Sequence, residues 1–381
     1  MFSILDTDLY KFSTSYAYMK LYPEAEGTFS FTDRNNTVYS TDFLQELTME
    51  FAKLSRISLS LMEKKWCIRH IPYIPECYWE WLRGFNFDLD KIVAWLDDEN
   101  HLHIEVTDKL YKVTLYEVPI LAIVSELYTK NTYINVSDAI DRLDAKIKLA
   151  NEHNLKFSEF GTRRRASASL HEMIVQRLHD KCPVCVGTSN VYLAMKYGMT
   201  PIGTFPHEWI MFHGAIWGYQ EANYLGMRDW VRTYDGNLGI FLMDTYTSKV
   251  GLNNMSLKFA KLFDGVRQDS GDEYKIGNMV IDRYTRLGID PTTKTIVFSN
   301  ALNFEKYKDI ANYFNNRIRV SAGIGTNITN DIHPANIVMK LSRCRINQNQ
   351  DWKKCIKISD DLGKHLGDNK EFEIAKYQLG I

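Results

Sequence analysis

A histidine lies between a proline and a carboxylate in the segment Gly203-Thr204-Phe205-Pro206-His207-Glu208-Trp209. Gly203 and Pro206 are typical of a tight loop, and the segment follows an expected strand and precedes an expected helix. A neutral imidazole can attack an electrophile, and the adjacent Glu208 carboxylate can orient the ring or stabilise its charge. A single histidine of this kind is more often a loop residue than a nucleophile. A catalytic role for His207 therefore depends on reactive residues at equivalent positions elsewhere in the chain.

Short apolar segments recur after about residue 155, and each ends in glycine or small polar residues before a helical segment. This strand–helix alternation predicts a parallel sheet, and seven strands favour an α/β fold with an irregular (β/α) TIM-like barrel. An open doubly wound sheet is the alternative, without the Gly-x-Gly-x-x-Gly that would make it dinucleotide-binding. The expected strands span residues 157–161, 184–188, 200–204, 240–245, 265–269, 295–300 and 318–323.

The carboxyl ends of parallel barrel strands meet on one rim, which is where active sites of this fold lie. Gly323 and Gly325 would let backbone amides approach a phosphate there, and the arginines at 163–165 offer forked donors to phosphate or carboxylate. Asp244, Asp269 and Asp272 add the negative charge that magnesium with a phosphorylated substrate requires. Each motif alone is also consistent with a turn or a solvated helix start. Their position on one predicted rim favours a single site for a magnesium-bound, phosphorylated sugar.

The first 125 residues have a different pattern, which predicts a smaller α+β domain ahead of a barrel at 126–344. Asp6 or Thr7 can begin a helix, and residues 27–32 alternate as a strand does. We expect a helix at 41–57, two short helices between 78 and 96, and a hairpin formed by 102–106 and 111–115. Helices are expected at 120–130 and 137–150. The tail at 345–381 breaks the barrel repeat, and a short strand at 355–359 is expected to return to the first domain.

The composition is that of an ordinary globular protein. The chain has 381 residues, 45% hydrophobic and 24% charged, with a net charge of -1, so we expect neither nucleic-acid nor membrane binding. We see no signal peptide and no apolar run long enough to span a bilayer. Six cysteines do not make a disulfide framework in a chain of this length, which favours a reducing, cytoplasmic compartment. Cys182-Pro183-Val184-Cys185 has no second pair or nearby histidines to complete a zinc site, so we expect ordinary thiols.

Several long motifs, in order along the chain, resemble nicotinate phosphoribosyltransferase. The similarity runs from residue 5 to the Ala-Lys-Tyr-Gln tail, and His-Glu-Trp resembles the nicotinate branch more than the sister nicotinamide enzyme. The stretch from Arg343 to Lys354 is more basic than we expect of the family. The motifs are Asp-Thr-Asp-Leu-Tyr-Lys at 6–11, Glu-Phe-Gly-Thr-Arg-Arg-Arg at 159–165, Gly-Thr-Ser-Asn at 187–190, Gly-Thr-x-x-His-Glu-Trp at 203–209, Val-Arg-Gln-Asp-Ser-Gly-Asp at 266–272 and Gly-Ile-Gly-Thr at 323–326.

The resemblance implies an enzyme that joins nicotinate to 5-phosphoribosyl 1-pyrophosphate in the Preiss-Handler route of NAD salvage. It implies magnesium as cofactor, ATP as a co-substrate hydrolysed through a phosphorylated His207, and a homodimer whose sites lie between subunits. Tyr10 of the neighbouring subunit and Phe160 would stack on the pyridine ring. Thr204 and Arg267 would contact nicotinate. By the same resemblance, Gly323, Gly325 and Thr326 would bind the sugar phosphate. Asp244, Asp269 and Asn300 would lie near the ribose and pyrophosphate. Arg34 and Arg164 are further site residues that the resemblance suggests.

The chemistry of such a transfer agrees with these residue types. A pyridine nitrogen displaces pyrophosphate at the anomeric carbon, so positive charge develops on the ribose ring, where carboxylates can stabilise it. Magnesium and arginines hold the leaving group, and an aromatic sandwich orients the flat base. A non-catalytic sensor of nicotinate or of the sugar phosphate on the same scaffold is the alternative, because fold does not fix function. The complete set of charged residues favours the enzyme.

Overall fold

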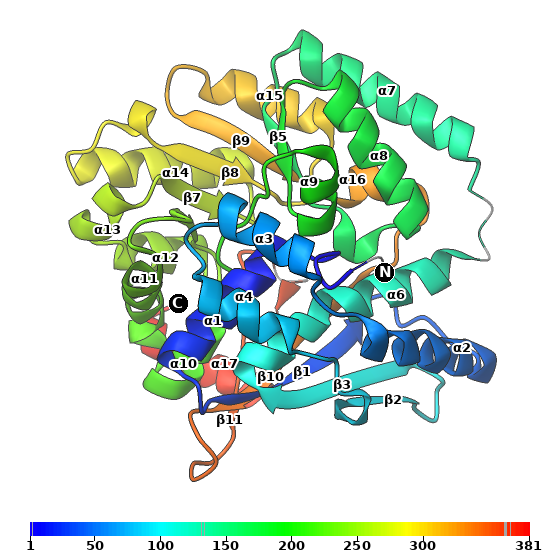
Figure 1. Ribbon diagram of the computed structural model, residues 1–381. Coiled ribbons are helices and arrows are strands. Elements are labelled where there is room, and N and C mark those ends of the chain that lie inside the picture. The colour runs from blue at the N-terminus through cyan, green and yellow to red at the C-terminus, as the bar shows by residue number, and fades with distance from the viewer. Residues whose placement is uncertain (2, 131, 133, 362–363, 366) are drawn as a thin grey trace.

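Two β-sheets, one antiparallel and one parallel, organise the chain (Figure 1). The computed structural model describes residues 1, 3–130, 132, 134–361, 364–365 and 367–381. The five-stranded antiparallel sheet has the order β11-β10-β1-β3-β2, and the six-stranded parallel sheet has the order β5-β4-β9-β8-β7-β6. No helix within the described ranges combines the length and the apolar character needed to cross a membrane.

The parallel sheet confirms the predicted α/β class and six of the seven expected strands. Residues 200–204 are different: Thr188 N–H donates to Thr200 O at 3.1 Å and Ile202 N–H to Thr188 O at 2.9 Å, but no strand forms. Pro201 has no N–H to continue a ladder. Among the described residues the ladder is therefore open between β5 and β6, and the barrel is irregular. The strands are β4 (Phe157–Glu159), β5 (Cys185–Thr188), β6 (Ile240–Leu242), β7 (Gly265–Gln268), β8 (Thr295–Phe298) and β9 (Arg319–Ile324).

Helices follow these strands and cover the outside of the parallel sheet (Figure 1). Side-chain caps fix where several of them begin: Asn190, Ser256, Asp272 and Asn303 each accept a backbone N–H of the first turn. Each strand end is thereby held close to a helix start. The helices are α7 (Val136–Glu152), α8 (Ala168–Lys181), α9 (Val191–Tyr197), α10 (His207–Trp217), α11 (Tyr219–Tyr234), α12 (Ser248–Asn254), α13 (Leu257–Leu262), α14 (Glu273–Arg286), α15 (Phe304–Phe314) and α16 (Thr326–Thr329).

The antiparallel sheet corrects two expectations about the first domain. β3 (Leu102–Lys109) pairs with β2 (Ile92–Leu96), so residues 92–96 form a strand and not the end of a second helix. The expected second arm of a hairpin is instead α5 (Leu110–Val113) followed by a 3-10 turn at Thr114–Tyr116. Leu110 and Val113 are buried three positions apart, which is a helical spacing that overrides the apparent alternation. The other elements here are β1 (Glu26–Asp33), α1 (Leu9–Leu21), α2 (Thr41–Ala52), α3 (Leu61–His70), α4 (Glu76–Arg83) and α6 (Glu117–Lys130).

The chain returns to the antiparallel sheet through β10 (Ile337–Arg345), which pairs with β1 along its whole length. β11 (Lys353–Lys354) adds a short edge strand, and the ring of Trp352 lies 5.2 Å from the guanidinium of Arg343 and 4.7 Å from that of Arg345. These cation–π contacts give the basic 343–354 stretch an ordered structure.

The tail then reaches the parallel sheet. Ile358 N–H donates to Thr245 O at 2.9 Å, and Thr247 N–H donates to Ile358 O at 2.8 Å. The expected strand at 355–359 is therefore a single parallel bridge to the loop after β6, and it carries Lys357 to the carboxyl ends of the barrel strands. α17 (Asn369–Leu379) ends the chain beside α11.

Candidate active site

A cavity of about 770 Å³ lies between the two sheets, at the carboxyl ends of the parallel strands. This is the predicted rim, and the cavity is large enough for a nucleotide-sized ligand. Its lining is rich in cations, so it suits an anionic ligand. Charged, aromatic and glycine residues that line it include Arg34, Phe160, Arg163, Arg164, His207, Arg267, Asp269, Gly323, Gly325, Thr326, Lys340, Lys357 and Lys364.

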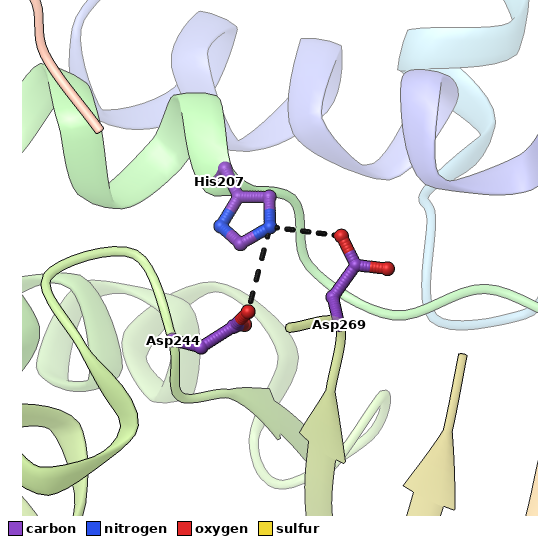
Figure 2. Close-up of side chains that lie close together, drawn as sticks. All are labelled: His207, Asp244 and Asp269. Atoms are coloured by element: carbon purple, nitrogen blue, oxygen red, sulfur yellow. Dashed lines mark hydrogen bonds and ion pairs between the residues drawn. The ribbon is translucent and has the colours of Figure 1, made fainter. Parts of the chain in front are cut away.

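His207 is the first residue of α10, and its buried ring points toward two aspartates from neighbouring strand ends (Figure 2). Nδ1 lies 2.9 Å from Thr245 Oγ1, and Nε2 lies 3.2 Å from Asp269 Oδ2. Asp244 Oδ1 is 4.0 Å from Nε2. Lys357 Nζ also approaches Nε2, at 2.9 Å. Thr245 therefore holds the ring through Nδ1, and Nε2 faces Asp244, Asp269 and Lys357.

Burial and the neighbouring Lys357 lower the pKa of His207 to about 4, although Asp244 and Asp269 act in the opposite direction. His207 is therefore neutral at physiological pH. In the tautomer that carries its proton on Nδ1, this nitrogen donates to Thr245 Oγ1 and Nε2 accepts a hydrogen bond from protonated Lys357. In this tautomer the lone pair that can attack an electrophile is on Nε2.

The two aspartates differ in their hydrogen-bond partners. Asp269 Oδ1 accepts hydrogen bonds from Ser299 Oγ at 3.0 Å and Arg267 Nη2 at 3.2 Å. Burial raises the pKa of Asp269, but the positive charges of Arg267 and Lys357 outweigh burial and hold it well below its usual value. Asp244 Oδ2 accepts from Ser270 Oγ, whereas the buried Oδ1 has no hydrogen-bond partner among the described residues.

A cation would satisfy that buried oxygen. One ligand atom each from His207, Asp244 and Asp269 lie within 4.8 Å of one another. Magnesium prefers oxygen ligands, so the two carboxylates fit this ion better than the imidazole does. Lys357 lies beside the same cluster, where burial lowers its pKa although Asp244 and Asp269 favour its charged form.

Arg267 and Phe160 form one wall of the cavity. The guanidinium lies 5.6 Å from the centre of the Phe160 ring. Its Nε donates to Ser299 Oγ at 2.8 Å and its Nη1 to Thr204 Oγ1 at 3.2 Å. Gly323 packs against the same ring, since a Cβ atom there would be 2.4 Å from Phe160. Only a residue without a side chain leaves the ring in this position.

Part of the cavity lining is strongly cationic. Arg34 and Arg164 lie there together with Gly325 and Thr326. Arg164 Nε donates to Ile337 O at 2.9 Å, which ties it to β10. Burial and the nearby Arg163 and Arg34 lower the pKa of Arg164 to about 10, which is the mark of several cations held close together. Such a group is stabilised by an anion.

Some predicted residues lie elsewhere. Glu208 does not touch His207: its Oε1 accepts from Thr114 Oγ1 at 2.5 Å, and its Oε2 pairs with Lys11. The expectation that this carboxylate orients His207 is wrong, because consecutive helix residues project about 100° apart. Asn300 binds Lys364 Nζ through Oδ1 at 2.6 Å, just outside the lining, and Tyr10 likewise lies outside it.

Sequence reasoning missed Lys340, Lys357 and Lys364. Lys357 had a signal: it is a single charged residue between the buried Ile356 and Ile358 in an apolar strand candidate. A buried cation in such a segment requires a partner charge. Lys340 lies on β10, outside every motif recognised in the sequence.

Comparison with known proteins shows which family the chain belongs to. The nicotinate phosphoribosyltransferase (NAPRTase) family profile matches residues 155–379, and the profile of its N-terminal domain matches residues 5–125. The nicotinate phosphoribosyltransferase of Desulforapulum autotrophicum is 40% identical over 97% of this chain and 96% of its own, and that of Chromohalobacter salexigens is 40% identical over 100% and 98%. The crystal structure of the Porphyromonas gingivalis nicotinate phosphoribosyltransferase superposes with a TM-score of 0.98 at 43% identity and covers 100% of both chains. A solved structure from Saccharomyces cerevisiae, described as a putative nicotinate phosphoribosyltransferase, gives a TM-score of 0.92 at 30% identity, covering 100% of this chain and 98% of its own. The chain belongs to the nicotinate phosphoribosyltransferase family.

Proposed function

We propose that this protein joins nicotinate to 5-phosphoribosyl 1-pyrophosphate, forming nicotinate mononucleotide and pyrophosphate, and that ATP hydrolysis drives the reaction through a phosphorylated His207. The observation that carries the proposal is the neutral His207, with Nε2 turned toward Asp269 and Lys357 at the wall of a cation-rich cavity. Family membership supports the same substrates.

Nicotinate would bind at the Phe160 wall. Arg267 has five N–H donors, and three of them bond Ser299, Thr204 and Asp269, which leaves two for a carboxylate. The fixed guanidinium is therefore pre-organised for a negatively charged pyridine acid. Phe160 supplies one ring face, and we propose that Tyr10 of a second subunit supplies the other.

The phosphorylated sugar would lie against the cationic part of the lining. Gly323, Gly325 and Thr326 would contact the sugar phosphate, and Arg34 and Arg164 would neutralise charge there. Asp244, Asp269 and Asn300 would lie near the ribose and pyrophosphate. Magnesium held by Asp244 and Asp269 would neutralise the departing pyrophosphate.

The transfer is a substitution at the anomeric carbon. The pyridine nitrogen forms the new C–N bond as the C–O bond to pyrophosphate breaks, and the electron pair leaves with pyrophosphate. The ribose ring passes through a positively charged state, which nearby carboxylates stabilise. Arg267 and Phe160 contribute by orienting the base for attack.

ATP coupling uses His207 itself. Nε2 attacks the terminal phosphorus, a P–N bond forms, and the bond to ADP breaks. Water later hydrolyses the phosphohistidine. The added charge would order the nearby lysines, arginines and magnesium for the sugar pyrophosphate. Glu208 would act indirectly, since its contacts to Lys11 and Thr114 fix the first turn of α10.

We infer a cytoplasmic homodimer that serves NAD salvage. All six cysteines are free thiols in the structure, which suits a reducing compartment. The homodimer inference rests on the expected role of Tyr10.

The test is to incubate the purified protein with nicotinate, 5-phosphoribosyl 1-pyrophosphate and magnesium, with and without ATP, and to resolve the products by chromatography. Nicotinate mononucleotide should form in both cases and faster with ATP. Nicotinamide serves as the control substrate. Binding of both substrates without any product would favour a sensor instead of an enzyme.

A further inference from the structure

Glu117, the first residue of α6, holds a buried carboxylate on which four side chains converge. Lys11 Nζ lies 2.5 Å from Oε2. The other oxygen, Oε1, accepts from the Tyr10 hydroxyl at 3.3 Å and lies 3.6 Å from Lys340 Nζ and 3.9 Å from Arg163 Nη1. The side chain is 1% exposed and does not line the cavity. Glu117 therefore lies behind the cavity wall, in contact with both wall residues and interior residues.

Two of these four partners, Arg163 and Lys340, do line the cavity. They come from different parts of the fold: Arg163 follows β4 in the barrel, and Lys340 lies on β10 of the antiparallel sheet. Two cations at one wall repel each other unless an anion lies between them. Arg163 has a second carboxylate nearby, Asp8, at 3.6 Å. Within the described ranges, Glu117 is the one carboxylate paired with Lys340.

Glu117 is ionised in this environment. Burial raises its pKa, but Lys11, Lys340 and Arg163 outweigh burial and lower it to about 2. A permanent negative charge therefore lies behind the wall. It does not compete for ligand, because its two oxygens are directed to protein groups.

We propose that Glu117 is a positioning residue for the transfer reaction: from behind the cavity wall it holds Arg163 and Lys340 in place and keeps Lys340 positively charged for the phosphorylated sugar. This inference rests on the proposed function and adds a residue to it. No motif that marks the site contains Glu117.

Charged groups from four parts of the fold act on the pKa of Lys340. Glu117 faces it from α6, Arg163 from the turn after β4, Lys11 from α1 and Lys357 from the tail. Burial and the three cations lower the pKa of Lys340 to about 8, and Glu117 alone among these groups raises it. Removing the negative charge of Glu117 should therefore make Lys340 lose its proton at a lower pH.

The experiment measures binding of 5-phosphoribosyl 1-pyrophosphate with magnesium to the full chain by calorimetry from pH 6 to 10, without nicotinate or ATP. Affinity of the unmodified protein should fall with a midpoint near pH 8. Glu117→Gln should move this midpoint down by about one pH unit or more. Glu26→Gln is the matched control, because Glu26 is also nearly buried and paired with Arg345 and Lys109, away from the cavity. Its midpoint should not move.

Lys340→Arg tests whether Lys340 is the group whose deprotonation weakens binding, since arginine stays charged from pH 6 to 10. It should remove the alkaline loss of affinity in the unmodified background and restore alkaline binding to Glu117→Gln. In turnover, Glu117→Gln should raise the KM for the sugar pyrophosphate and change kcat less, which general destabilisation would not do.

An active enzyme whose midpoint is the same with and without Glu117→Gln would overturn the inference and leave the proposed function intact. An unmodified protein that makes no nicotinate mononucleotide would defeat the proposed function, while the binding titration would still report the coupling of Glu117 to Lys340. If Glu117→Gln does not fold, Lys340→Arg alone decides: an alkaline loss that persists in that variant refutes the role given to Lys340.

Discussion

His207 Nε2 lies 2.9 Å from Lys357 Nζ, although 150 positions separate the two residues. The contact exists because Ile358 pairs with the loop after β6 and carries its neighbour into the cavity. The lysine helps to keep the imidazole neutral, since its charge lowers the pKa of His207. The tail of the chain thus contributes to the reactivity of a residue at a barrel strand end.

Lys357→Met should raise the pKa of His207 above its present value of about 4, because Asp244 and Asp269 remain and favour the charged ring. A protonated imidazole cannot attack ATP, so the acid limb of phosphohistidine formation should move to higher pH. Initial rates of ADP release from ATP between pH 4 and 8 check this, because they do not depend on survival of the acid-labile phosphohistidine. Lys357→Arg keeps the positive charge and should retain the original limb. An identical acid limb in the methionine variant would show that Lys357 does not set the pKa.

Arg267→Gln should lower kcat/KM for nicotinate about 10- to 140-fold, because a hydrogen-bonded charge pair contributes roughly 1.5–3 kcal/mol. Nicotinamide lacks the negative charge, so the preference for nicotinate should narrow. Arg267→Lys is the matched variant: it keeps the positive charge but loses the forked guanidinium that hydrogen-bonds Thr204 and Ser299. Steady-state kinetics with both bases provides the measurement. An unchanged preference would place the carboxylate site elsewhere, with Arg164 the next candidate.

Gly323→Ala should impair nicotinate binding, because the new Cβ would lie 2.4 Å from the Phe160 ring and displace it. The KM for nicotinate should rise by at least several-fold, since an aromatic contact contributes about 0.5–1.5 kcal/mol beyond its buried area. Gly84→Ala is the control, where the nearest atom to a Cβ is 3.5 Å away. Equal KM values in the two variants would remove Phe160 from the nicotinate site.

The residues predicted from sequence and those missed differ in one physical respect. Phe160, Arg267 and Gly323 lie at or just after the carboxyl ends of strands in a repeating βα pattern, and the parallel arrangement brings such strand ends together. Lys340 and Lys357 reach the cavity through long-range pairing of β10 with β1 and of the tail with the β6 loop, which no local periodicity encodes.

Two of the errors have local causes. The supposed hairpin after β3 is a helix because burial at Leu110 and Val113 has helical spacing. Adjacency in the sequence suggests that Glu208 orients His207, yet its carboxylate binds Lys11 and Thr114 in the interior.

Tyr10→Ala should raise the KM for nicotinate without abolishing dimer formation, if the Tyr10 ring stacks in a neighbouring subunit's site. Mixing this variant with Arg267→Gln should create hybrid dimers in which one site has both an intact Tyr10 and an intact Arg267. Activity of the mixture should then exceed the sum of the separate variants. Tyr10→Phe, which loses only the hydroxyl bonded to Glu117, is the control and should keep most of the stacking. Absence of recovery in verified mixed dimers would argue against shared sites.

His207→Ala should abolish both phosphate labelling from gamma-labelled ATP and ATP hydrolysis, because Nε2 is the proposed acceptor. A slower, ATP-independent transfer should remain, since Phe160, Arg267 and the cationic wall are intact. Phosphohistidine is acid-labile and base-stable, so label on the unmodified protein should survive alkali and disappear in acid. His207→Glu should retain more transfer than alanine by supplying part of the negative charge. His213→Ala is the matched control, because His213 lies in the same helix but is buried against Asp229, outside the cavity. Acid-labile label that persists after His207→Ala would place the acceptor on another residue and remove His207 from the centre of the mechanism.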